Sequence, residues 1–175
     1  MTVERGRPVR DALEVILVAL LIAVGVRAFV LEAFVVEGPS MEPTLYSEER
    51  LLVFKLAYLF GPPRPGDIVV FRVPWDGSKD YVKRVIATGN ETVEIRQGTV
   101  YVDHRPVAEP YTHLPDRSNL APVRVPPGYI FVLGDNRPQS EDSRYFGPVS
   151  DQLIEGKAIF LWWPPSRFAW LGGPF

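Results

Sequence analysis

Residues 67–102, DIVVFRVPWDGSKDYVKRVIATGNETVEIRQGTVYV, decide the fold class of this 175-residue chain. Short runs rich in Val, Ile, Phe and Tyr recur in this stretch, at residues 67–73, 81–88, 91–97 and 99–102. Runs of these residue types, bounded by Gly, Pro, Asn or Asp, are typical of β-strands. Because Gln97-Gly98 separates the last two runs, we expect a hairpin turn there. The stretch therefore predicts an antiparallel sheet.

Further runs of the same kind lie outside this stretch, at residues 32–37, 50–54, 129–133 and 156–161. With them, the chain predicts a mainly β fold class, with an antiparallel, barrel-like β domain built from residues 32–88 and 123–163. Residues 103–127 differ, because they are rich in proline and only weakly periodic. Together with the hairpin before them, they predict a small cap insertion over residues 89–122.

The composition excludes several classes of protein. A hydrophobic content of 46% excludes a disordered chain, which needs low hydrophobicity and a high net charge. The formal net charge of −2 argues against a nucleic-acid partner bound through a broad basic face. Because the sequence contains no cysteine, it has no disulfide, no thiol nucleophile and no cysteine-ligated zinc.

The N-terminal part of the chain is its most apolar segment. Residues 12–31, ALEVILVALLIAVGVRAFVL, carry only two charged side chains, and a helix of about 20 residues spans the core of a bilayer. We therefore predict a transmembrane anchor over residues 12–31. Three arginines precede this segment. The positive-inside tendency then places residues 1–11 in the cytoplasm and the rest of the chain on the extracytoplasmic side.

Two other interpretations of this segment stay open. A cleaved signal peptide has the same charged start and apolar middle, but residues 27–38 contain no convincing small-x-small cleavage site. A buried helix of a soluble protein is the second alternative, because the uninterrupted apolar run, residues 15–26, is short for a membrane span. The uncleaved anchor is the preferred interpretation.

Aromatic residues concentrate near the C-terminus, where the chain contains Phe160, Trp162, Trp163, Phe168 and Trp170. Tryptophan favours the interface between a membrane and water. The same residues would also close an ordinary hydrophobic core. Both interpretations apply to the aromatic tail, residues 164–175.

A candidate nucleophile lies just after the N-terminal segment. In GPSMEPTL, residues 38–45, Ser40 follows Pro39 and is three residues before Pro43. Proline fixes its own φ and restricts the residue before it, so the loop is stiff and presents one hydroxyl. An ordinary turn has the same composition.

Lys83 is a candidate base. It lies within the predicted strand YVKRVI, residues 81–86, and is one of only four lysines in the chain. Burial lowers the pKa of an amine, whereas an arginine at this place would stay charged. A buried Lys83 would therefore accept a proton near neutral pH. The alternative is a strand lysine that extends its ammonium group into water.

The third candidate stretch is GDNRPQSEDSRYFG, residues 134–147. Asp142 and Arg144 are spaced to form an ion pair that braces the loop, and Ser140 would then point its hydroxyl at a nearby base. A polar surface loop with a weak ion pair is the alternative. The two histidines, His104 and His113, lie in the proline-rich segment without a catalytic or metal-binding motif, so neither a Ser-His-Asp triad nor a metal site is expected.

Taken together, these stretches resemble the bacterial type I signal peptidases, membrane-anchored Ser-Lys proteases of the peptidase S26 kind. The family's S-M-x-P-T-L box matches residues 40–45, and its G-D-x-V-V-F strand matches residues 66–71. Its lysine box matches residues 81–86, and its last box matches residues 134–147 at every fixed position. The boxes occur in the family's order behind an apolar N-terminal segment.

The resemblance implies a role for each matched residue. Ser40 would be the nucleophile and Lys83 the general base, with Ser140 hydrogen-bonded to the lysine and Asp142 and Arg144 forming a supporting ion pair. Substrate-binding residues would lie on two strands: Ala33, Phe34, Val35, Val36, Tyr81 and Val82. The backbone N–H of Ser40 would be one oxyanion donor. The second donor stays open, because some members have a serine where this chain has a glycine two residues before Ser40.

The implied activity is cleavage of N-terminal signal peptides from exported precursor proteins, after Ala-x-Ala, through an acyl-enzyme. The resemblance implies no cofactor and no metal. Its partners would be the precursors and the lipid bilayer of the cell membrane, with no nucleic acid, and the chain would act as a monomer. Two other functions are alternatives. A non-catalytic, membrane-anchored envelope binding module would tolerate the loss of Ser40 and Lys83. Self-cleaving repressors share the Ser-Lys chemistry but begin with a DNA-binding helix-turn-helix.

Overall fold

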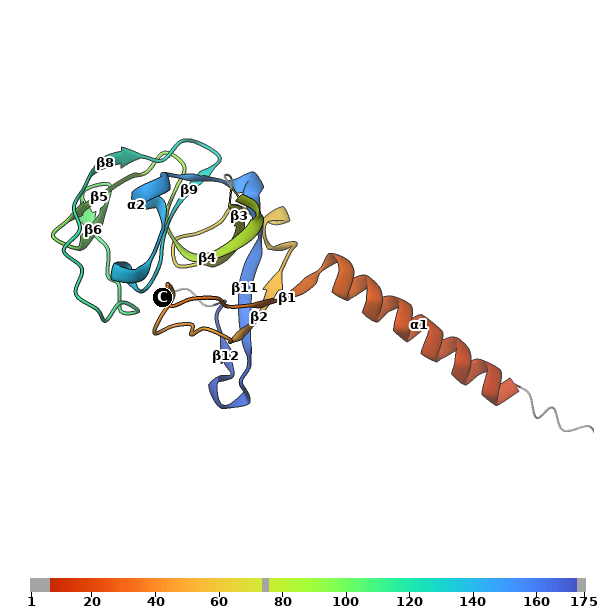
Figure 1. Ribbon diagram of the computed structural model, residues 1–175. Helices are drawn as coiled ribbons and strands as arrows, with labels where there is room; N and C mark the ends of the chain where they lie inside the picture. Colours follow the sequence, from red (N-terminus) through yellow and green to blue (C-terminus); the bar gives the residue numbers. More distant parts are fainter. Residues whose placement is uncertain (1–6, 74–75, 173–175) are drawn as a thin grey trace, which may run out of the picture.

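A computed structural model of the protein describes residues 7–73 and 76–172 (Figure 1). Over these residues the chain forms one long helix, α1 (Arg7–Phe29), and two antiparallel sheets. A second helix, α2 (Ser143–Phe146), and four short 3₁₀ helices lie in the connections: η1 (Ala57–Leu59), η2 (Arg137–Gln139), η3 (Asp151–Leu153) and η4 (Pro165–Arg167). The prediction of a mainly β, antiparallel fold is confirmed.

The larger sheet holds the candidate residues of the lysine box. Its strands follow the order β1 (Leu31–Val35), β2 (Arg50–Phe54), β11 (Ile154–Trp163), β3 (Ile68–Val73), β4 (Asp76–Thr88), β9 (Tyr129–Leu133) and β10 (Val149–Ser150), with β12 (Ala169–Trp170) also paired to β11. Register shifts interrupt several of these pairings. Such irregularities bend a sheet. In the part of the chain that the structure describes, β1 and β10 are not paired with each other. The larger sheet is therefore not a closed barrel in these residues, and the barrel-like form of the prediction is not confirmed.

The smaller sheet has the order β7 (Arg105–Pro106), β6 (Thr99–Val102), β5 (Thr92–Arg96) and β8 (Leu120–Arg124). Figure 1 shows its strands on the side of the molecule away from α1. Strands β7 and β8 were not predicted, because their prolines lack a backbone N–H and obscure the strand pattern. The division of the chain into a core and a cap stays a prediction.

The strands are apolar because both faces of the larger sheet are covered. Along β4, Val85 belongs to one buried cluster and Ile86 to another, since successive side chains of a strand point to opposite faces. The cluster around Ile86 joins the two sheets, and its buried members are Ile86, Ala87, Val93, Ile95, Val100, Val125, Phe131 and Leu133. This shared core ties the smaller sheet to the strand that carries Lys83.

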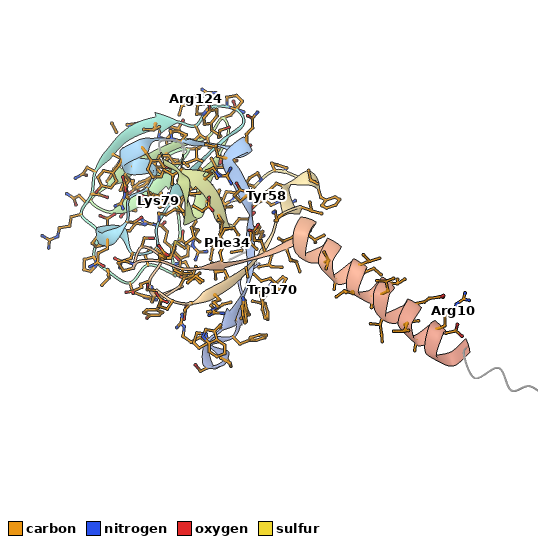
Figure 2. All side chains as sticks on the ribbon, turned by 45° about the vertical axis from the view of Figure 1, so that its right-hand side comes forward. Arg10, Phe34, Tyr58, Lys79, Arg124 and Trp170 are labelled. Atoms are coloured by element: carbon orange, nitrogen blue, oxygen red, sulfur yellow. The ribbon has the colours of Figure 1, made fainter. Side chains whose placement is uncertain are left out.

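Helix α1 projects from the sheets, as Figures 1 and 2 both show. Its apolar side chains are more than half exposed, and they comprise Leu13, Val15, Ile16, Leu17, Val18, Leu20, Leu21, Ile22 and Val24. Their exposure contradicts the alternative interpretation of this segment as a buried helix. Among the described residues, no helix has the length and apolarity that a membrane crossing requires. Residues 1–6 of the expected cytoplasmic stretch lie outside the described residues.

The aromatic tail closes the core at two positions, and its place at a membrane interface stays a prediction. Ala169 and Leu171 pack against a buried cluster of the larger sheet, which is core closure. Phe168 and Trp170 are more than half exposed and contact Phe160 edge-on. Residues 173–175 of the tail lie outside the described residues.

Candidate active site

Buried anchors hold the loop that presents Ser40. Met41 and Leu45 have no exposed surface and belong to the cluster beneath β2 and β3. Before them, Gly38 has a φ of +79°, a conformation that favours glycine. The loop also contacts the segment after β9, because the backbone N–H of Asn136 donates to the carbonyl of Ser40 at 3.1 Å. Buried apolar side chains and a backbone hydrogen bond therefore both hold the Ser40 loop in place.

Lys83 lies against Ser40. The Nζ of Lys83 is 2.8 Å from the Oγ of Ser40 and 3.1 Å from the carbonyl oxygen of Val82. Only 3% of the lysine is exposed, so its ammonium group does not extend into water. The two residues are 43 positions apart in the sequence, and they meet because β4 passes beneath the Ser40 loop.

Burial changes the protonation of Lys83. Removal from water lowers the pKa of Lys83 from 10.5 to about 8, although the carboxylates of Asp142, Glu141 and Asp135 oppose this shift. A neutral amine at hydrogen-bond distance can take the proton of a hydroxyl. The arrangement is therefore able to activate Ser40 as a nucleophile near neutral pH.

An ion pair braces the loop that follows β9. Arg144 donates from Nε to Asp142 Oδ1 at 2.8 Å and from Nη2 to Oδ2 at 2.9 Å. Asp142 is fully buried, begins α2, and also accepts from the backbone N–H of Gly134 at 3.1 Å. The pair expected from the spacing is present in the structure, and its contribution to catalysis stays a prediction.

Ser140 differs from the expectation. Its Oγ is buried and has no hydrogen-bond partner among the described residues, so the expected hydrogen bond to Lys83 is not formed. The hydroxyl lies close to Gly134 instead: a Cβ added there would lie 2.2 Å from Ser140 Oγ and 2.5 Å from the carbonyl oxygen of Ser40. Ser140 thus packs on the glycine backbone. Motif spacing placed this serine beside the site but could not predict its side-chain direction.

A second buried ion pair was missed in the sequence. Arg84, beside Lys83 on β4, donates to both oxygens of Asp135 at 2.8 and 2.7 Å, and neither side chain is exposed. Thr44, from the Ser40 loop, donates to Asp135 at 2.5 Å. The signal was present, because an arginine within a strand of buried residues requires a partner. This network joins the Ser40 loop, β4 and the loop after β9.

A cleft of about 490 Å³ opens in front of Ser40 and Lys83. Its walls include most of the predicted substrate-binding residues, namely Phe34, Val35, Val36, Tyr81 and Val82. Ala33, which was also predicted to bind substrate, does not line it. Figure 2 labels Phe34 and Lys79, two residues of the lining.

The cleft also has polar walls that the sequence did not predict, formed by Glu37, Lys79, Asp80, Gln139 and Glu141. Neither histidine lines it. His104 is exposed and lies 3.5 Å from Glu94 on the smaller sheet, and His113 is exposed in the proline-rich segment.

Several known proteins are similar to this chain over most of its length. The profile of the family described as "Signal peptidase, peptidase S26" matches residues 9–163. The chain is 42% identical over 171 residues to "Probable signal peptidase I-1" of Synechocystis sp., covering 94% of this chain and 87% of the relative. It is 42% identical over 167 residues to "Signal peptidase I" of Bacillus caldolyticus, covering 87% and 90%. A crystal structure of a signal peptidase I from Enterococcus faecalis is 34% identical, covers 54% of this chain and 95% of its own, and gives a TM-score of 0.49. On the extent of the profile match and the identity to these relatives, the chain belongs to the signal peptidase family, peptidase S26.

Proposed function

We propose that this protein is a signal peptidase I, a serine endopeptidase that removes N-terminal signal peptides from exported precursor proteins, with Ser40 as nucleophile and Lys83 as general base. The observation that carries the proposal is the 2.8 Å contact between the Nζ of a buried Lys83 and the Oγ of Ser40. Family membership provides the reaction class.

The reaction follows from the two groups. Neutral Lys83 takes the Ser40 proton while Oγ attacks the scissile carbonyl, and the tetrahedral intermediate collapses to an acyl-enzyme as the protonated lysine passes its proton to the leaving amine. Lys83 is then neutral again and removes a proton from water, which hydrolyses the ester and frees Ser40. The backbone N–H of Ser40 is the proposed oxyanion donor. Gly38 contributes no side-chain donor.

The substrate binds as an extended segment in the cleft. β1 forms an edge of the larger sheet and pairs only with β2 in the described residues, so its outer side can accept another strand. Phe34, Val35 and Val36 then contact the substrate from one side and Tyr81 and Val82 from the other. A backbone-bound strand with shallow apolar pockets suits small residues before the cut, in the pattern Ala-x-Ala.

The residues behind the cleft support this chemistry. Asp142 and Arg144 hold the loop against the N–H of Gly134. Ser140 packs on the same glycine, and we assign it a supporting role through this packing rather than through a bond to Lys83.

Helix α1 is the proposed membrane anchor. It has 23 residues, which correspond to roughly 34 Å of helix. Apolar side chains are exposed on all its sides from Leu13 to Val24, and such a helix needs an apolar environment. We propose a single-pass protein of the cell membrane that acts as a monomer, with the N-terminus cytoplasmic and the sheets on the extracytoplasmic side.

The assay that tests the function uses the full chain, purified in detergent, and a precursor with an Ala-x-Ala site. Mass spectrometry of the products should show one cut, directly after the second alanine. The control precursor carries tryptophan in place of that alanine and should stay intact. If neither precursor is cut, the non-catalytic binding module becomes the better interpretation.

The cleavage rate should decrease as the pH is lowered. Because Lys83 acts as a base only when neutral, and its pKa is about 8, kcat/KM should fall as the pH drops below that value. The profile of kcat/KM from about pH 6 to 9 reports the groups of the free enzyme. A constant kcat/KM over this range would contradict a neutral lysine base.

A further inference from the structure

The proline-rich segment 107–118, which we call the strap, contacts the catalytic region from the side of the smaller sheet. Both its ends are tied to that sheet: the N–H of Val107 donates to the carbonyl of Val100 at 2.9 Å, and the N–H of Gly98 donates to that of Ser118 at 2.9 Å. Between these ends, Glu109, Tyr111 and Asp116 each meet a different arginine.

We propose that the strap positions the Ser40–Lys83 pair, with Glu109, Tyr111 and Asp116 as positioning residues that hold three arginines behind the cleft. This inference rests on the proposed function, and it assigns a task to a segment that the proposed chemistry does not use.

The first contact is made by Tyr111. The guanidinium of Arg84 lies 4.0 Å from the centre of the Tyr111 ring. Arg84 is fully buried and directly follows Lys83 on β4, and it also donates to Asp135. A cation over an aromatic face is most strongly attracted when water is excluded. The ring thus covers the ion pair that joins β4 to the loop after β9, and Thr44 of the Ser40 loop donates to the same Asp135.

The second contact is made by Glu109. Its two oxygens accept from both terminal nitrogens of Arg137, and both side chains are almost fully buried. The Nε of Arg137 donates in turn to the carbonyl of Gly134 at 2.9 Å. Gly134 touches both Ser140 and the Ser40 carbonyl. Glu109 therefore helps to hold the Ser40 loop in place, because it fixes Arg137 and Arg137 binds Gly134.

The third contact is made by Asp116, which lies 3.5 Å from Nη1 of Arg144. The same arginine pairs with Asp142 and donates from Nη2 to the carbonyl of Arg137. Each of the three arginines thus bridges the strap and the catalytic region. Such paired buried charges are costly to separate, so the strap favours one arrangement of the loop.

The position of the strap predicts which kinetic constant it affects. No strap residue lines the cleft, so substrate binding should not depend on it directly. The charged and titratable groups around Lys83 lie on the cleft side or in the loop after β9, and they are Glu37, Lys79, Asp80, Tyr81, Glu141, Asp135 and Asp142. None of these groups belongs to the strap. A strap variant therefore changes the pKa of Lys83 only by moving its side chain or by admitting water to it.

The test compares three single variants of the full chain in detergent. Tyr111→Leu removes the ring, and Tyr111→Phe keeps the ring over Arg84 but removes the hydroxyl that donates to Glu109 at 3.1 Å. His113→Ala changes an exposed residue of the same segment. We expect Tyr111→Leu to lower kcat by about 10- to 100-fold, the cost of misplacing catalytic groups, with KM unchanged. His113→Ala should keep the kcat of the wild type, and Tyr111→Phe should keep more of it than Tyr111→Leu, because its ring still covers Arg84.

A second readout does not depend on cleavage. The chain has four lysines, so ¹³Cε-lysine NMR gives four signals, and Lys83→Ala identifies the one of interest. In Tyr111→Leu the titration midpoint of Lys83 should rise from about 8 toward 10.5, as water reaches the amine. If the wild type cleaves nothing but this midpoint still rises, the proposed function fails and the strap remains coupled to Lys83.

Two results would overturn the strap's role: a folded Tyr111→Leu with wild-type kcat and an unchanged Lys83 midpoint, or an equal loss of kcat in His113→Ala. Thermal melting establishes which variants are folded. Should Tyr111→Leu fail to fold, Asp116→Asn decides, because it keeps the size of the side chain and removes the charge that faces Arg144. Asp116 also accepts from the N–H and the hydroxyl of Ser118 at 2.8 and 2.7 Å, so Ser118→Ala is the control for the loss of the hydroxyl contact. Asp116→Asn is expected to lower kcat with KM unchanged, and wild-type kcat in this variant would reject the role.

Discussion

Replacing Lys83 with methionine is expected to abolish precursor cleavage while making the folded protein more stable at pH 7. Activity should fall by about 10⁴-fold or more, as in other serine hydrolases that lose a member of the catalytic group. Ser40→Ala should cause an equal loss, because nucleophile and base act as a unit. Lys83→Arg should be inactive too, since its guanidinium stays charged.

The gain in stability has a separate physical reason. Holding the pKa of Lys83 at about 8 instead of 10.5 costs about 3 kcal/mol, at about 1.4 kcal/mol for each pKa unit. This cost is fully present below pH 8, where the unfolded chain binds the proton more tightly than the fold does, and it disappears above 10.5. Methionine keeps the apolar stem without the charge.

Denaturant unfolding at two pH values checks this prediction. The free energy of unfolding of Lys83→Met should exceed that of the wild type by about 3 kcal/mol at pH 7. This difference should shrink as the pH rises from about 8 to 10.5. Near-normal turnover in either Ser40→Ala or Lys83→Met would show that the catalytic roles are assigned wrongly.

Replacing Gly134 with alanine is expected to cause the second largest loss. The new Cβ would lie 2.5 Å from the carbonyl oxygen of Ser40 and 2.2 Å from Ser140 Oγ. The Ser40 contact is with backbone, which cannot rotate away as a long side chain can. We expect a loss of about 100-fold in kcat/KM, the effect of moving a catalytic group by about 1 Å, and about 1–3 kcal/mol of stability from overpacking.

Gly77→Ala is the matched control for this variant. Gly77 lies on β4, the strand of Lys83, and a Cβ added there would meet no atom within 4 Å. Cleavage of the Ala-x-Ala precursor and the melting temperature are measured for both. If Gly134→Ala cleaves as well as Gly77→Ala, the close approach of Ser40 and Gly134 does not control the nucleophile.

Local patterns predicted most of the sheet structure. β2, β6 and β9 have the predicted bounds, because short apolar runs between turn residues specify a strand without reference to the rest of the chain. β8 was missed, since Pro122 hides its pattern and its pairing with β5 involves residues far away in sequence. The pairing of the two edge strands, which determines whether a barrel closes, leaves no local signal either.

In the candidate site, too, local sequence predicted some features, whereas others depend on residues that are distant in the sequence. Residue types and their order identified Ser40, Lys83, Asp142 and Arg144, because a nucleophile, a base and a bracing ion pair need particular functional groups. The same patterns wrongly predicted that Ser140 bonds Lys83. They also missed the strap, whose arginine partners lie at least 27 residues away in the sequence, the separation of Tyr111 and Arg84 (111 − 84 = 27).

By itself, the amino-acid sequence determined which chemical groups this protein has available and in what order they occur. Tertiary structure alone decided that Lys83 is buried against Ser40 with a pKa of about 8. It also decided that Arg84 pairs with Asp135, and that Ser140 faces Gly134. The physical reason is that hydrogen-bonding groups belong to single residues, whereas exclusion of water and side-chain direction depend on atoms from distant strands packed together.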